Sequence, residues 1–147
     1  MAKKLTFKQV IFSTFRELFI HHHTSLEFRA KLFALIIAAG EKHDDECALD
    51  IVKKCGMDIY DNNERASMLT MTTKEFINNV VEENDYGLDS LIHSIMDDIK
   101  AVPRYAQKID PAHLKELLSC SVDNDSKIYQ ERVIEFLERL KQDHLKE

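Results

Sequence analysis

The sequence has few of the residues that a β-sheet protein needs for its turns. Its 147 residues include only 3 glycines and 2 prolines, although tight turns depend strongly on both. This scarcity favours long helices joined by a small number of turns. Apolar residues make up 44% of the chain and charged residues 31%, as in a globular protein rather than a disordered one. One domain is expected at this length, with a core that needs neither a disulfide nor a metal.

Long apolar runs and catalytic motifs are also missing. No apolar run reaches about 18 residues, so no transmembrane helix is expected. The apolar stretch from Leu5 to Ile20 is interrupted by Lys8, Arg16 and Glu17, and no cleavage site of a secretory signal follows it. There is no glycine-rich phosphate loop and no evident base paired with a cysteine. The sequence therefore predicts a protein that is not an enzyme.

Cysteine is scarce and occurs in an odd number. Cys47, Cys55 and Cys120 are the only three, and none of them forms a C-x-x-C pair. This pattern predicts a reducing compartment, the cytoplasm, in which the three side chains are small buried thiols.

Charge is unevenly distributed along the chain. The net charge is −6, but residues 1–34 carry +4 and the remainder carries −10. An acidic body repels phosphate backbones, so a duplex nucleic-acid partner is not expected. Basic protein segments and divalent cations are the ligands that such a surface attracts.

The apolar periodicity predicts an all-α, single-domain bundle of about seven helices and no strand. We expect Asp44 to cap a helix that Gly56 ends, and Gly40 to end the preceding helix in a left-handed conformation. Thr72-x-x-Glu75 has the spacing of a capping box, and Asp110-Pro111 is a strong helix start. The expected helices cover about residues 5–20, 24–39, 44–55, 64–69 (within an ambiguous stretch), 72–85, 88–100, 110–122 and 127–145.

The last expected helix is amphipathic. Its inward side chains should be Ile128, Val133, Ile134, Phe136, Leu137 and Leu140.

An internal repeat emerges when the chain is shifted by 85 residues. Both segments then read as an apolar helix, a polar loop, an acidic residue and a second apolar helix. This pattern predicts two similar helix–loop–helix halves whose polar loops can lie near each other at one end of a bundle. The aligned pairs are Leu32 with Leu117, Phe33 with Leu118, Ile37 with Val122, Lys42 with Lys127, Glu46 with Glu131, Leu49 with Ile134, Ile51 with Phe136, and Val52 with Leu137.

The first loop, residues 38–46, reads Ala-Ala-Gly-Glu-Lys-His-Asp-Asp-Glu. It resembles the Ala-Asp-Gly…Glu loop that occurs twice in TerB-like domains, and residues 123–131 lie where the second copy would be. The resemblance covers about residues 25–142 of a single domain, 1–147, and leaves the N-terminal helix, about 5–20, outside it. The chain departs from the family at Ala39, where Asp is usual, and at Asp125, where Gly is usual.

The resemblance implies an all-helical module that interacts with a protein partner or senses a signal in a stress response such as tellurite resistance. It also implies that acidic loop residues can bind a divalent cation, Ca²⁺ or Mg²⁺. The matching metal positions in this chain are Asp44, Glu46, Asn124, Asp125 and Glu131.

Three alternatives stay open at this point. Asp44, Asp125 and Ser126 can act only as helix caps, with the other acids solvated. The adjacent His21, His22 and His23 make a poor chelate, because neighbouring helical residues point in different directions. The Phe-rich N-terminal helix can belong to the core, lie on a membrane surface or support self-association into a homo-oligomer.

Overall fold

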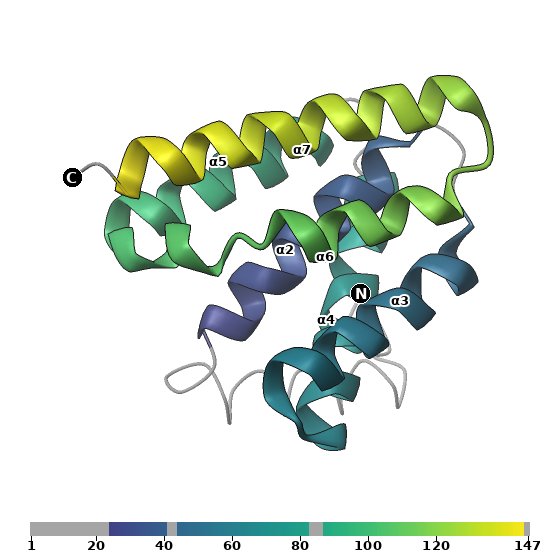
Figure 1. Ribbon diagram of the computed structural model, residues 1–147, viewed down its shortest axis with the longest axis horizontal. Coiled ribbons are helices and arrows are strands. Elements are labelled where there is room, and N and C mark those ends of the chain that lie inside the picture. Colours follow the sequence, from purple (N-terminus) through teal and green to yellow (C-terminus); the bar gives the residue numbers. More distant parts are fainter. Residues whose placement is uncertain (1–23, 41–43, 83–86, 146–147) are drawn as a thin grey trace, which may run out of the picture.

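The computed structural model describes residues 24–40, 44–82 and 87–145. Over these ranges the chain folds into six α-helices and two short 3-10 helices without a strand, which confirms the all-α prediction (Figure 1). The expected N-terminal helix at 5–20 and the histidines at 21–23 lie outside the described residues. The elements are α2 (Thr24–Ala39), α3 (Asp45–Tyr60), α4 (Asn63–Glu82), α5 (Gly87–Ala101), η2 (Pro103–Lys108), α6 (Pro111–Glu116), η3 (Leu117–Cys120) and α7 (Asn124–Leu145).

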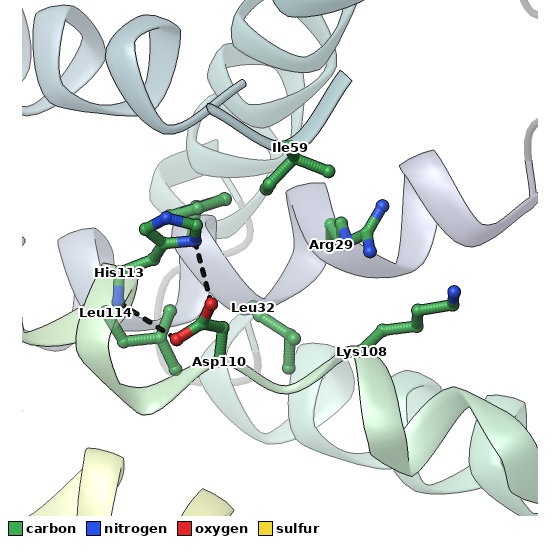
Figure 2. Close-up of a pocket in the computed structure, with 8 residues that line it drawn as sticks. Arg29, Leu32, Ile59, Lys108, Asp110, His113 and Leu114 are labelled. Atoms are coloured by element: carbon green, nitrogen blue, oxygen red, sulfur yellow. Dashed lines mark hydrogen bonds and ion pairs between the residues drawn. The ribbon is translucent and has the colours of Figure 1, made fainter. Parts of the chain in front are cut away.

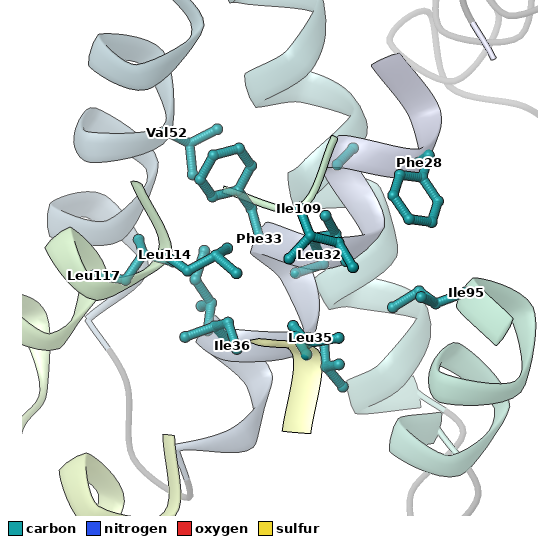
Figure 3. Packing of buried hydrophobic residues seen from close by; sticks show 14 of the residues in the cluster. Phe28, Leu32, Phe33, Leu35, Ile36, Val52, Ile95, Ile109, Leu114 and Leu117 are labelled. Carbon is teal, nitrogen blue, oxygen red and sulfur yellow. The ribbon is translucent and has the colours of Figure 1, made fainter. Parts of the chain in front are cut away.

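Helix α2 forms the centre of the core. It packs against α4, α5, α7, η2 and α6, and its apolar side chains are buried around most of its circumference, as expected of a helix that is hydrophobic on all sides. Figure 3 shows its side chains meeting Val52 of α3, Ile95 of α5, and Leu114 and Leu117 of the α6–η3 segment. No described helix is both long and apolar enough to cross a membrane.

Helix α3 runs further than the sequence predicted. Asp44 caps its first turn as expected, because its side chain accepts a hydrogen bond from the backbone N–H of Cys47 at 3.1 Å. The expectation that Gly56 ends the helix is wrong, since α3 continues to Tyr60. The left-handed position is taken by Asp61, with φ of 48°. Gly40 follows the end of α2 as expected, but without a positive φ.

Helix α4 is continuous, so the expected break and capping box at Thr72 are wrong. The hydroxyls of Thr72 and Thr73 donate to the carbonyls of Met68 and Leu69, each at 2.7 Å. Buried threonines inside a helix satisfy their hydroxyls in this way, by bonding back four residues. The start is capped instead by Asn62, whose side chain accepts from the N–H of Arg65.

The C-terminal half confirms one expected start and corrects another. Asp110 caps α6 ahead of Pro111, accepting from the N–H of Ala112 at 3.1 Å. Helix α7 begins at Asn124, three residues before the expected start, because the side chain of Asp123 accepts from the N–H of Ser126 at 2.7 Å.

Candidate functional site

A disulfide joins the start of α3 to η3 at one end of the molecule. Cys47, in the first turn of α3, bonds to Cys120, at the end of η3, and their Cα atoms lie 5.8 Å apart. The start of α3 therefore lies close to residues 121–123, which precede α7. The proximity of the two polar loops stays a prediction, because residues 41–43 lie outside the described residues. The expectation of three free thiols is wrong for this pair, and the cysteine pattern no longer argues for a reducing compartment.

A buried hydrogen-bond network supports the same end of the fold. Gln130 is only 3% exposed. Its side-chain amide donates to the carbonyl of Ile36 at 2.9 Å, and its oxygen accepts from the hydroxyl of Ser121 at 2.6 Å. Each contact satisfies a polar group that burial would otherwise penalise. The network fixes the first turns of α7 against the last turn of α2.

The residues predicted to bind metal all lie at or near this end. Asp44 is committed to capping α3, and the remaining four, Glu46, Asn124, Asp125 and Glu131, have exposed side chains on the first turns of α3 and α7. The cap of α7 is Asp123, not Asp125 or Ser126 as the capping alternative held. Among the described residues, no group of three His, Cys, Asp or Glu side chains is arranged to hold a metal ion.

The remaining cysteine lies on the opposite half of α3. Cys55 is fully buried, and its thiol donates to Oε2 of Glu116 at 3.1 Å. Burial, with the hydrogen bond and negative charge of Glu116, raises the pKa of the Cys55 thiol to about 12. The thiol hydrogen bond in turn lowers the pKa of the Glu116 carboxyl, with Lys54 acting in the same direction. The expected inert burial of this cysteine is confirmed.

A small pocket lies nearby, between α2, the end of α3 and the start of α6. Figure 2 shows His113 facing Asp110, with Arg29, Lys108 and Ile59 around them. Nδ1 of His113 lies 3.2 Å from Oδ2 of Asp110, and its Nε2 lies 3.8 Å from Oδ2 of Asp58. A water molecule's centre can reach about 10 Å³ of the pocket, which is room for roughly one water.

This pocket gives little support for catalysis by a Cys–His pair. A thiol with a pKa near 12 is protonated at neutral pH, whereas the thiolate is the nucleophile. The groups that face the ring nitrogens of His113 are the carboxylates of Asp58 and Asp110, and its Nδ1 has no hydrogen-bond partner in proper geometry among the described residues. We interpret the contact of His113 with Asp58 as a tie between α6 and the end of α3, and the contact of His113 with Asp110 as local to the start of α6.

A second candidate surface lies along α7, where the sequence prediction failed. Phe136 and Ile128 were expected inside, but they are 39% and 42% exposed. Ile134 and Leu137 are buried as predicted, and the polar Ser126 and Gln130 complete the buried strip of α7. Beside it runs a partly exposed apolar strip with 4-3-4 spacing, here called the α7 seam. Its members are Tyr129, Val133, Phe136 and Leu140.

No protein-family model, curated protein or solved structure matches the chain.

Proposed function

We propose that this protein is a non-enzymatic, TerB-like helical module that binds a protein partner in a stress response. The observation that carries the proposal is the α7 seam. Tyr129 is 50% exposed and Phe136 is 39% exposed, and exposed aromatic side chains on a rigid element are characteristic of binding surfaces. The TerB-like part rests on the residues of the two loops, 38–46 and 123–131.

The arrangement of the fold supports a binding role for this helix. Helix α7 has 22 residues, and it forms the upper edge of the molecule in Figure 1. The buried network around Gln130 and the contact of Lys141 with the carbonyl of Ile109, at 2.7 Å, hold it to the rest of the fold. A rigid helix presents a side-chain strip at low entropic cost, which favours its use in recognition.

The proposal places the protein in the cytoplasm. In that compartment Cys47 and Cys120 are thiols until an oxidant joins them. With hydrogen peroxide, the two thiols lose two electrons and two protons, the S–S bond forms and the peroxide is reduced to two waters. Oxidative stress would then join α3 to η3 without involving the buried Cys55.

Site-specific photo-crosslinking in the producing cell tests the binding role. p-Benzoylphenylalanine in place of Tyr129 should yield a discrete adduct that Phe136→Glu abolishes. The same probe in place of the exposed Lys74 of α4 is the control and should yield none. Equal adducts at both positions, or no adduct at position 129 under tellurite or peroxide stress, would reject the proposal.

A further inference from the structure

The α7 seam is flanked by arginines that have no partner among the residues that the structure describes. Arg132 and Arg139 are exposed, and within the described part of the chain neither takes part in an ion pair or a side-chain hydrogen bond. Residues at positions i, i+3, i+7 and i+10 of a helix share one side. Tyr129, Arg132, Phe136 and Arg139 have this spacing, so aromatic and guanidinium groups alternate along the seam. Tyr, Phe and Arg are the residue types enriched at the centres of protein interfaces.

The spacing of the seam indicates what shape of partner it fits. Apolar positions separated by four, three and four residues form the a/d seam of two heptads, the pattern by which one helix packs along another. From Tyr129 to Leu140 the seam is about 17 Å long at 1.5 Å per residue. The next position of this spacing after Leu140 is Asp143, which is not apolar, and the position before Tyr129 is Ser126, which is buried. The seam thus ends at Tyr129 and Leu140. The seam therefore fits a helix of about two heptads.

The charges indicate the chemistry of that helix. On one flank of the seam, Gln130 and Leu137 are buried in the core, so a docked helix meets charge mainly on the other flank. The central charges there are Arg132 and Arg139. Guanidinium groups bind carboxylates through two parallel hydrogen bonds, and flanking charges of this kind determine partner choice between helices.

We infer that the α7 seam binds an amphipathic partner helix whose apolar strip is flanked by Asp or Glu side chains. This inference rests on the proposed binding role and names the partner's chemistry. A second copy of the chain fits less well, because it would bring its own Arg132 and Arg139 to the contact. An anionic membrane or nucleic acid fits less well too, because Glu131 and Glu135 lie exposed on the outer side of the same helix and repel phosphate.

A pair of designed peptides tests the inference on the full chain. Both carry Leu at the a and d positions over three heptads, and they differ only in having Glu or Lys at every flanking position. Because the protein has a net charge of −6, long-range attraction favours the Lys peptide. Preference for the Glu peptide therefore reports the local arginines. We expect the Glu peptide to bind at least about tenfold more tightly in fluorescence anisotropy.

Three variants complete the experiment, each checked for helix content by circular dichroism. Phe136→Asp should abolish binding of the Glu peptide. Arg132→Glu with Arg139→Glu should reverse the preference, whereas the matched double change Arg65→Glu with Lys74→Glu on the exposed face of α4 should leave it intact. Equal affinity for both peptides, or an unchanged preference after the α7 charge reversal, overturns the inference.

Two further outcomes assign the seam to another occupant and equally overturn the inference. One is a dimer in sedimentation that Phe136→Asp dissociates. The other is binding to vesicles of anionic phospholipid that the same variant abolishes. If neither peptide binds but the probe at position 129 still forms its adduct in the cell, only the acidic-helix partner is rejected. If neither peptide binds and no adduct forms, the binding role itself is rejected.

Discussion

Cys47 and Cys120 lie 73 residues apart in the sequence and are joined by a disulfide. The bond connects the first turn of α3 to the end of η3. Gln130 makes its contact with Ile36 at this same end. One covalent link therefore fixes α3 to η3, and one buried network fixes α7 to α2, at this end of the molecule.

Breaking the disulfide should lower the stability of the oxidised chain measurably. A crosslink that closes a loop of this length restricts the unfolded chain, and such bonds typically contribute about 2–4 kcal/mol. We expect reduction with dithiothreitol, after prior oxidation with peroxide, to lower the melting temperature by roughly 5–15 °C. The double variant Cys47→Ser with Cys120→Ser should melt at the lower temperature whether or not reductant is present.

Peptide mapping checks that the link is the one described. A non-reduced digest should contain one crosslinked peptide pair, from Cys47 and Cys120, and Cys55 should be alkylated only after unfolding. A disulfide from Cys55 to Cys47 or Cys120 would contradict both the described pairing and the burial of the Cys55 thiol against Glu116.

Stability should depend on pH at both extremes through Cys55 and Glu116. The pKa of the Cys55 thiol is raised from 9.0 to about 12 in the folded protein, so the folded state holds this proton more tightly. Its stabilising contribution is complete below pH 9 and is lost as the pH rises from 9 towards 12. The pKa of Glu116 is lowered from 4.5, so its contribution is present above pH 4.5 and is lost as the pH falls further.

Urea unfolding between pH 3 and pH 11 measures this dependence. The variant Cys47→Ser with Cys120→Ser is the background, so that no disulfide exchange occurs at high pH. Adding Cys55→Ala should flatten the alkaline limb. Adding Glu116→Gln should reduce the loss of stability at acid pH. It should also lower the pKa of the Cys55 thiol, measured by thiolate absorbance. That pKa should stay above 9, because burial is the largest cause of the shift. A thiol that titrates near 9 in the folded protein would contradict this account.

The close packing of α3 on α4 should make Gly56 intolerant of a methyl group. A Cβ placed on Gly56 would lie 2.9 Å from Cα of Ala66 and 3.3 Å from Cδ2 of Leu69. Helix propensity alone would favour alanine by about 1 kcal/mol, but overpacking against backbone costs roughly 1–3 kcal/mol. We expect Gly56→Ala to lower the free energy of unfolding by about 1 kcal/mol. Adding Ala66→Gly to Gly56→Ala should recover part of the lost free energy of unfolding. If Gly56→Ala alone were more stable than the parent protein, α3 and α4 would be able to move apart at no cost, which contradicts this account.

The elements that the sequence predicted well depend on neighbouring residues. The cap at Asp44, the start at Asp110-Pro111 and the fully apolar α2 are determined within one or two helical turns. The misplaced features depend on distant partners. Gly56 lies inside α3, where the absence of a Cβ lets Ala66 of α4 come close, and such an approach between two helices leaves no local pattern in the sequence.

The seam on α7 was missed for the same reason. The sequence placed members of two adjacent apolar strips of α7 inward, and only Ile134 and Leu137 of the strip that contains Gln130 are fully buried. The amide of Gln130 in that strip reaches the carbonyl of Ile36, 94 residues away. The outward position of Phe136 follows from that contact. The pairing of Cys47 with Cys120 is equally non-local, and an odd number of cysteines does not reveal it.

Divalent cations should leave the melting temperature unchanged. Calcium needs several oxygen ligands that converge on one point, but the Asp44 side chain accepts from a helix N–H, and the side chains of Glu46, Asp125 and Glu131 are solvent-exposed. Chelator-treated protein is melted with millimolar Ca²⁺, Mg²⁺, Mn²⁺ or Zn²⁺. A site filled at 100 times its dissociation constant would add about 2.7 kcal/mol, a rise of roughly 5–10 °C. A metal site at these acidic residues would be shown by such a rise with one cation. The rise would have to be lost in Asp125→Ala and in Glu131→Ala but kept in the exposed control Glu135→Ala. No rise would leave Asp44 as a helix cap and Asp125 as a solvated acid.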